Sequence, residues 1–418
     1  MKLDLHSPAR KRVTAAMVVL AAGVYLGLTA REFVASWFGN RPELKSLQRA
    51  VWLDGGNAEY RNHVGRYYDL VGRDPATAIA HYKTAVQLNP HSARYWFDLA
   101  SAYQVMSDTQ NQTQALEQAI HADGTTPDVA WEAANLYLVQ GEYEKALREF
   151  HVVMANDSSL ANLSIQYAWR MDPDVDMLLR DVVPHTTDAL VPFLGLLESK
   201  QETDATYKVW NALIESGDSF EKRYAFDYFQ YLIRFNQVDK AQTVWQQTVD
   251  RFGLSSYLAS SNNLVANGSF DFDPLNAGFD WQYQRNPGVQ LTLDPTDHHS
   301  GRRSLLINFD GPAINDAGIF QLIPVQPNTT YDFGAYYKNG EMEGAGGPHL
   351  TIQDMYSQAI YYESDELKEA GFWKSVDGEF TTGPACRLVM LHIRRLPSGS
   401  PIRGKLWVDD FHLTKKSS

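Results

Sequence analysis

The sequence has a single cysteine, Cys386, among its 418 residues. One cysteine cannot form an intramolecular disulfide, a thiolate zinc cluster or a C-x-x-C redox pair. Beyond residue 12 there is also no cluster of lysine and arginine, and the formal charge is −13, from 37 Lys plus Arg against 50 Asp plus Glu. Because phosphate recognition requires clustered positive charge, this balance argues against nucleic acid as a partner.

Catalytic motifs are lacking as well. The sequence contains no G-x-S-x-G, HExxH, Walker loop or G-x-G-x-x-G. A glycosidase needs two carboxylates held about 5 to 9.5 Å apart across a sugar ring, and here the acidic residues are scattered. The adjacent pair His298 and His299 is expected to lie in a surface loop, because neighbouring side chains of an extended segment point in opposite directions. We therefore expect no enzyme.

What the sequence does have is enough apolar material for several cores. Its length predicts two or three domains, and hydrophobic residues make up 44% of the chain and aromatic residues 12%. Global disorder is therefore excluded.

The N-terminus has the pattern of a membrane anchor. Basic residues Lys2, Arg10, Lys11 and Arg12 precede 18 uncharged residues at 13–30. As a helix this run would span roughly 27 Å, close to the thickness of a bilayer core. Positive flanks stay in the cytoplasm, so the chain after residue 30 is expected outside it, which in a bacterium is the periplasm. A cleaved signal peptide is the alternative, and it exports the same domains.

A helical repeat pattern runs from Pro42 to about Gly253. Three small residues recur 35 and 34 positions apart, and a tyrosine follows each of them by three positions; these residues are Gly65, Ala100 and Ala134, with Tyr68, Tyr103 and Tyr137. Second helices carry small and large residues four apart, namely Ala78 with Tyr82, Ala115 with Ala119, and Ala146 with Phe150. Small residues allow neighbouring helices to approach closely, so the pattern predicts about five stacked helical hairpins.

This pattern resembles the tetratricopeptide repeat. The W-x2-L-G/A-x2-Y signature is seen in Trp96, Leu99, Ala100 and Tyr103, and A-x3-F is seen in GEYEKALREF at 141–150. The resemblance implies an all-α solenoid that binds an unidentified protein partner. The tryptophans Trp96, Trp131, Trp210 and Trp245 are interpreted as packing residues of that solenoid.

The pattern changes after Ser255, where apolar residues begin to alternate with polar ones. Three segments show this period of two, at 302–309, 329–338 and 404–413. In the first two, the predicted buried residues are Leu305, Ile307 and Phe309, then Tyr331, Phe333, Ala335 and Tyr337. Many short strands with one buried face predict a β-sandwich of about 150 residues.

The order of landmarks in this region resembles the jelly-roll carbohydrate-binding modules of galactose-binding-like fold. These landmarks are NLVANGSFDF at 263–272, FDWQ at 279, HSGRRSL, FQLIPVQPNTTYDFGAYYK, FWKSVDGEFTT and LWVDDFHL. The resemblance covers 263–414 and implies a sandwich that binds glycans without cleaving them, often with a structural calcium. The sequence departs from the family at Asp271, where a glutamate is common after NGSF.

Three carboxylates are candidate metal ligands. Period-two alternation places Asp409 on the face of Trp407 and Phe411, where an uncompensated charge would cost several kcal/mol. Calcium held by Asp271 and by Asp409 or Asp410 would compensate it. Backbone amides at a strand end could satisfy Asp409 instead, or a bulge could turn it outward, and both alternatives stay open.

A glycan cleft is predicted from residues opposite the buried faces. Tyr336 lies opposite the buried set of its strand, and the same alternation places Gln353 and His392 outward. Trp281 is the stacking candidate, since sugar rings stack on aromatic faces, and a core tryptophan is its alternative. We expect these four residues to line a shallow cleft.

The sequence thus predicts a multidomain protein of bacterial inner-membrane location. Its predicted parts are a cytoplasmic basic segment (1–12), a single transmembrane helix (13–30), an all-α tetratricopeptide-type solenoid (42–254), a linker (255–262) and an all-β jelly-roll sandwich (263–414). The favoured hypothesis is a periplasmic adaptor that holds a protein partner and a polysaccharide, in surface glycan export or assembly. A purely structural scaffold and a cryptic glycan-active enzyme are the alternatives.

Overall fold

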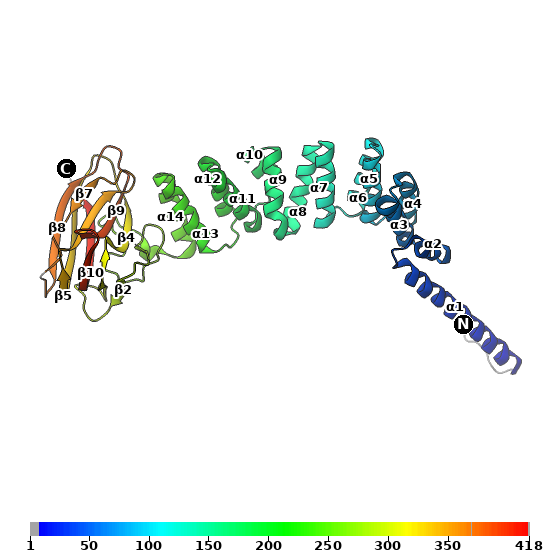
Figure 1. Ribbon diagram of the computed structural model, residues 1–418, viewed down its shortest axis with the longest axis horizontal. Helices are drawn as coiled ribbons and strands as arrows, with labels where there is room; N and C mark the ends of the chain where they lie inside the picture. The colour runs from blue at the N-terminus through cyan, green and yellow to red at the C-terminus, as the bar shows by residue number, and fades with distance from the viewer. Residues whose placement is uncertain (1–7, 369, 417–418) are drawn as a thin grey trace. The chain divides into compact units, whose positions relative to one another are not determined.

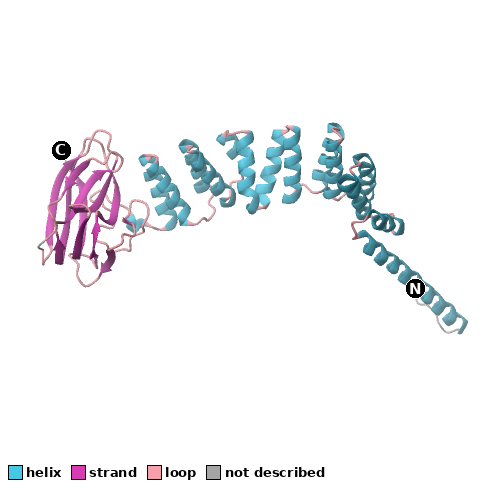
Figure 2. Ribbon diagram, viewed as in Figure 1, coloured by secondary structure: helices cyan, strands magenta, loops and turns pink. Residues whose placement is uncertain are grey.

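A computed structural model describes residues 8–368 and 370–416 of the chain (Figure 1). The predicted basic residue Lys2 lies outside this range. Helices occupy the first part of the described chain and strands the last part (Figure 2). The predicted fold class, an apolar N-terminal helix followed by helices and then a two-sheet sandwich, is confirmed.

The α-helices of the described residues are α1 (Pro8–Gly39), α2 (Leu44–Leu53), α3 (Ala58–Tyr67), α4 (Pro75–Leu88), α5 (Ala93–Val105), α6 (Thr109–Ala122), α7 (Pro127–Gln140), α8 (Tyr143–Asn156), α9 (Ala161–Met171), α10 (Val175–Met177), α11 (Thr187–Lys200), α12 (Thr203–Glu215), α13 (Lys222–Arg234) and α14 (Val238–Phe252). Short π or 3-10 turns are η1 (Tyr68–Gly72), η2 (Ser158–Leu160), η3 (Leu178–Val182) and η4 (Ser255–Tyr257).

The strands are β1 (Gln282–Tyr283), β2 (Val289–Asp294), β3 (Ser304–Ile314), β4 (Asp316–Pro324), β5 (Thr330–Gly344), β6 (Gly347–Asp354), β7 (Ile360–Glu363), β8 (Lys374–Thr381), β9 (Leu388–Leu396) and β10 (Ser400–Lys415). They form two five-stranded antiparallel sheets. The first sheet has the order β1-β4-β9-β6-β7, and the second sheet has the order β2-β3-β10-β5-β8.

The chain forms two compact units, which divide between Leu196 and Leu197. The first unit holds α1 to α10 and most of α11. The second unit holds α12, α13 and α14 together with both sheets. The last helices and the sandwich therefore belong to one compact body.

Helix α1 is long and apolar enough to cross a membrane, and its apolar window is unburied. A signal sequence near an N-terminus can also be this long and apolar, so both predicted readings of the segment agree with the helix. The helix extends beyond the predicted span 13–30 at both ends.

Small residues bring the helices of the first unit together as predicted. A Cβ atom on Gly65 in α3 would lie 2.6 Å from the ring of Tyr82 in α4. Tyr82 fills the space that this missing side chain leaves, and it is 1% exposed. The predicted small residues Ala78, Ala100, Ala134 and Ala146 are all fully buried. These contacts agree with a helical repeat domain, and membership of the tetratricopeptide family stays a prediction.

The sandwich core lies between the two sheets. The predicted inward sets of β3 and β5 are confirmed, because Leu305, Ile307 and Phe309 and Tyr331, Phe333, Ala335 and Tyr337 are all buried in it. From the first sheet, β4, β6 and β9 contribute aliphatic residues such as Ile319, Leu350 and Leu391.

Trp407 and Asp409 were predicted to share the core-facing side of β10 with Phe411, and this was wrong. Leu406 and Val408 face the core, so Trp407 and Asp409 point to the outer face of the second sheet. The register against β5 shifts between Asp409 and His412, and Asp410 adopts a left-handed φ of 50°. This bulge inserts one residue and returns Phe411 to the core, which simple alternation could not anticipate.

The hairpin of α13 and α14 packs against the sandwich within the second unit. Phe279 lies in the loop before β1 and packs its ring edge-to-face on Phe229 of α13, with 4.8 Å between the ring centres. The centre of the Trp245 ring of α14 is 6.5 Å away. The preceding Gly278 has φ +63°, and a Cβ there would come within 2.0 Å of the Trp245 ring. Only glycine fits at this position.

Polar contacts extend the same interface. The Gln230 amide donates to Gln282 on β1 at 3.0 Å, and the Tyr356 hydroxyl donates to the carbonyl of Ile233 at 2.8 Å. Arg387 pairs with Asp239 at the start of α14 at 3.0 Å. Since both side chains of this last pair are exposed, it contributes little, and the aromatic contacts dominate.

Replacing Phe279 with alanine is expected to destabilise the second unit. The residue is 7% exposed and fills the space between two helices, so loss of its ring should cost about 3 kcal/mol. Thermal unfolding followed by tryptophan fluorescence measures the change. Phe372→Ala is the control, because that residue is 69% exposed and loss of its ring should cost less than about 0.5 kcal/mol. Equal midpoints for the two variants would contradict the packing role.

Candidate functional site

The four predicted glycan residues do not share one face of the sandwich. Gln353 on β6 and His392 on β9 belong to the first sheet, whereas Tyr336 on β5 belongs to the second sheet. The outer faces of the two sheets point in opposite directions across the core. These residues therefore cannot line a single cleft with Tyr336.

Trp281 lies in the core, so its assignment to a cleft is corrected. Its side chain is 1% exposed. Its ring stacks on Phe270 and packs edge-to-face on Phe411, with 4.9 and 5.0 Å between the ring centres. Its indole N–H donates to the carbonyl of Asn267 at 3.1 Å. No face of the ring is open to a sugar. The alternative interpretation, a core tryptophan, is the one that the structure confirms.

Several residues on the outer face of the first sheet are buried. Leu322 and Leu388 point away from the sandwich core by alternation, yet they are 2% and 0% exposed. Gln282 on the same face is 7% exposed and accepts the hydrogen bond from Gln230 of α13. Helix α13 thus reaches this face, which a free sandwich would present to solvent.

His392 and Gln353 point outward as predicted but are not exposed. They are 8% and 7% exposed, and Gln353 donates to Gln358 at 2.8 Å. Nδ1 of His392 lies 2.6 Å from a carboxylate oxygen of Asp316. Among the described residues, Nε2 of His392 and the hydroxyl of its cross-strand partner Thr351 have no hydrogen-bond partner. The face is polar and enclosed rather than a shallow cleft.

Tyr336 lies on the outer face of the second sheet in an aromatic group. The ring of His299 stacks on it at 3.6 Å with an interplanar angle of 11°, and Trp373 meets His299 edge-on at 5.9 Å. His299 therefore covers a face of the tyrosine ring that sequence analysis had left free for a sugar.

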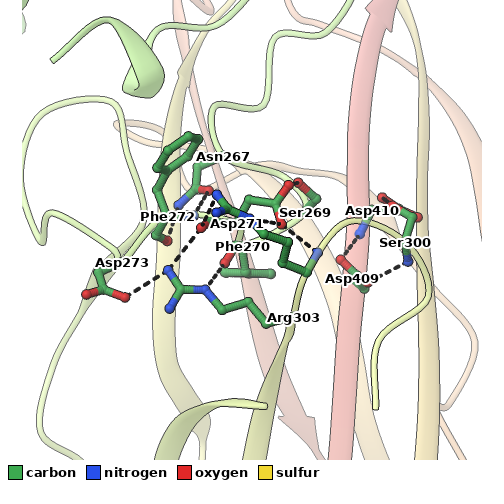
Figure 3. A network of polar contacts seen from close by, with 11 residues as sticks. Asn267, Ser269, Phe270, Asp271, Phe272, Asp273, Ser300, Arg303, Asp409 and Asp410 are labelled. Atoms are coloured by element: carbon green, nitrogen blue, oxygen red, sulfur yellow. Dashed lines mark hydrogen bonds and ion pairs between the residues drawn. The ribbon is translucent and has the colours of Figure 1, made fainter. Parts of the chain in front are cut away.

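The three predicted metal ligands all hold the loop between β2 and β3 (Figure 3). Asp409 is fully buried and accepts from the backbone N–H groups of His299, Ser300 and Asp410 at 2.8, 3.1 and 2.8 Å. Burial is the larger effect and raises the pKa of Asp409 to about 6, while these N–H groups oppose the rise.

Asp410 and Asp271 bind the same loop from either side. The hydroxyl of Ser300 donates to Asp410, and Nδ1 of His299 lies 2.5 Å from it. Asp271 accepts from the backbone N–H of Arg302 at 2.7 Å. The guanidinium of Arg303 donates to the carbonyls of Phe270 and Asp271 and pairs with Asp273 (Figure 3).

These contacts do not fit a calcium shell. Calcium takes six to eight oxygen ligands, and the oxygens of Asp409 already accept backbone N–H groups. Within residues 8–368 and 370–416, no group of three or more His, Cys, Asp and Glu side chains is arranged to hold a metal. Backbone amides and a bulge, the two alternatives to calcium, both occur at Asp409.

Asp280 is a second buried carboxylate, which sequence analysis did not identify. It is fully buried, one oxygen accepts from the Leu275 N–H at 2.7 Å, and the other has no partner among the described residues. Burial raises its pKa to about 7.

Calcium is expected to leave the stability of the protein unchanged. Millimolar calcium chloride and a chelator should give the same unfolding midpoint, because the loop is held by carboxylate to amide contacts. Asp409→Ala should cost about 3 kcal/mol, since three backbone N–H groups lose the acceptor that they share. A midpoint that rises with calcium in the wild type and not in the variant would contradict this account.

Raising the pH should destabilise the protein through Asp280. Its folded pKa of about 7 lies above its ordinary value of 3.8, so the folded state holds a proton that the unfolded state releases. The stability that this proton contributes is complete below about pH 4 and is lost as pH rises to about 7. Asp280→Asn should reduce the fall in unfolding midpoint between pH 5 and pH 8. Parallel pH profiles for both proteins would contradict the assignment.

Comparisons with known proteins concern the sandwich. Residues 262–392 match the family model described as "Carbohydrate binding domain", which is less than half of the chain. No curated protein matches the sequence. The family match agrees with the resemblance predicted from the order of landmarks.

Solved structures with similar sandwiches include three binding modules. "CBM4 structure and function" has 14% identity, covers 36% of this chain and 99% of that chain, and has a TM-score of 0.29. "Family 16 Carbohydrate Binding Module-2" has 18% identity, 36% and 99% coverage and a TM-score of 0.26. "Structure of TmCBM61 in complex with beta-1,4-galactotriose" has 16% identity, 37% and 100% coverage and a TM-score of 0.25. The family match, rather than these likenesses, identifies residues 262–392 as a carbohydrate-binding domain on a jelly-roll sandwich.

Proposed function

We propose that the protein is a membrane-anchored adaptor of the bacterial periplasm that binds a polysaccharide, in the export or assembly of surface glycans. The observation that carries the proposal is the match of residues 262–392 to a carbohydrate-binding domain, on a sandwich with two intact sheets. Such a domain binds sugars without needing a catalytic pair of carboxylates, and we propose no enzyme activity.

The anchor in this proposal is α1. Its uncharged stretch is unburied in the first unit, and Arg10, Lys11 and Arg12 flank it on the N-terminal side. Burying such a helix in a bilayer would remove its exposed apolar surface from water. The positive flank would keep the N-terminus in the cytoplasm and place both units outside it.

The protein partner in this proposal would bind the helices of the first unit. A groove of about 740 Å³ is lined by residues of α3, α5 and α7. Arg66 pairs there with Asp98 at 3.0 Å, and Trp131 lies beside them. Burial, together with nearby Asp98, raises the pKa of Glu132 in the same groove. Charges of both signs around an aromatic ring suit a polar peptide segment.

A structural scaffold is the second candidate function. It is favoured by the contacts of α13 and α14 with the first sheet, because the end of a helical array needs a cover for its last apolar face. In that case the sandwich would act as a cap and would bind no sugar.

The two candidates differ in one measurement. The full-length protein in detergent should bind at least one member of a panel of neutral and anionic oligosaccharides in isothermal titration calorimetry. The panel comprises xylohexaose, β-1,4-galactotriose, cellohexaose, laminarihexaose and hexagalacturonate. A protein with a sharp unfolding transition that binds none of them would overturn the polysaccharide role and leave the scaffold.

A further inference from the structure

A groove of about 740 Å³ crosses the outer face of the second sheet. It is lined from three adjacent strands, by Asn308 and Asp310 of β3, by Gly340, Glu341 and Glu343 of β5, and by Arg403 and Trp407 of β10. The lining comes from these strands alone, without a residue of α12, α13 or α14. The groove is therefore a surface that the sandwich presents to solvent.

Trp407 supplies a fixed aromatic ring at this groove. Its indole N–H donates to Asp294 at 2.8 Å, and Nζ of Lys338 lies 5.7 Å from the ring centre. Lys338 is itself held by Asp297 at 2.5 Å. The ring is half-buried and cannot rotate without breaking its hydrogen bond, so little conformational entropy would be lost when a ligand stacks on it.

Gly340 keeps the groove open beside the ring. A Cβ at this position would lie 3.5 Å from the indole, which is ordinary contact, and any longer side chain would extend into the groove. The φ of Gly340 is not in the left-handed region, so the backbone does not require glycine here. Because Gly340 has no side chain, the part of the groove next to the indole ring stays empty.

Four charged side chains around the groove have no partner among the described residues, whereas Asp310 accepts from Gln290 at 3.1 Å and from Asn308 at 2.9 Å. Glu341, Glu343, Arg403 and Lys405 are exposed, and none of their side chains makes a hydrogen bond or ion pair with a described residue. An aromatic ring with donors and acceptors of both kinds around it is the arrangement that binds sugars, because the ring stacks on C–H groups while the polar groups bond the hydroxyls.

The residues predicted to bind sugar on the opposite face of the sandwich are buried. The predicted residues Gln353 and His392 are less than 9% exposed, and Gln282 on that face is bonded to α13. The first sheet thus contacts α13 at its edge strand, whereas no helix residue lines the groove on the second sheet.

We propose that the groove at Trp407 is the site where the carbohydrate-binding domain holds a neutral polysaccharide. The proposal rests on the proposed function and names the face that performs it. Neutrality follows from charge: the groove has three carboxylates, Asp310, Glu341 and Glu343, against the two cations Arg403 and Lys405, and the chain carries −13 overall. A polymer of uronic acids would be repelled.

Four variants of the full-length protein test this site. Gly340→Gln places a side chain in the groove without removing any contact of Trp407, and Trp407→Ala removes the ring. Gln353→Ala probes the covered first sheet, and Phe372→Ala removes an exposed ring outside the groove. Each is titrated by calorimetry with the neutral oligosaccharide of the panel that the wild type binds most tightly, and its unfolding midpoint is measured in parallel.

Gly340→Gln and Trp407→Ala should each weaken binding by about tenfold or more, as the loss of a central aromatic contact does. Gly340→Gln should keep the wild-type midpoint, which separates loss of binding from loss of folding if Trp407→Ala is unstable. Gln353→Ala and Phe372→Ala should bind like the wild type.

The remaining outcomes overturn the proposal in distinct ways. Wild-type affinity in Gly340→Gln, or weakened binding in Gln353→Ala, would remove the Trp407 site and leave the proposed function standing. Tighter binding of hexagalacturonate than of every neutral sugar would overturn the neutral class. Absence of binding across the whole panel would overturn the site and the polysaccharide role together.

Discussion

The contact of Phe279 with Phe229 and Trp245 determines which surfaces of the second unit are available. The backbone of the loop before β1 lies directly against the Trp245 ring, and this is possible only because Gly278 has no side chain. This places α13 and α14 beside β1, which is the edge strand of the first sheet. The groove at Trp407 lies on the second sheet, away from these contacts.

The same constraint gives the carbohydrate-binding domain a structural role beside its proposed one. The last hairpin of a helical array exposes an apolar face, and here the sandwich packs against it through Phe279 and through hydrogen bonds at Gln282 and Tyr356. A cap and a sugar-binding module are compatible in one domain because the two roles use opposite sheets.

Two carboxylates show how the loops of the sandwich are held. Asp409 and Asp271 each accept backbone N–H groups of the segment that follows β2, so this segment is attached to β10 and to the start of the domain at once. Burial of Asp409 disfavours its charged form, and this desolvation outweighs the three N–H groups that favour the charge. The pKa of Asp409 is therefore raised. His299 completes the arrangement by bonding Asp410 and stacking on Tyr336.

The sequence by itself determined the class of each part, because periodicity depends on local geometry alone. Small and large residues four apart indicated packed helices, and Tyr82 does fill the space beside Gly65. Alternation along β3 and β5 predicted the core residues correctly, and the order of landmarks predicted the carbohydrate-binding domain. The outward direction of Gln353 and His392 was also predictable, since the pairing of β6 with β9 is regular at those positions.

Only the tertiary structure decided which outward residues are open. Alternation along β6 and β9 does not report that Gln353 and His392 are buried, because their partners Gln358 and Asp316 lie outside those two strands. The orientation of Trp407 was decided by the bulge at Asp410, although Lys405 two positions earlier was a signal that this side of β10 faces solvent. The candidate site therefore moved from the four predicted residues to the groove at Trp407. The physical reason is that contacts made outside a strand, and a register shift of one residue, leave no periodic trace in the sequence.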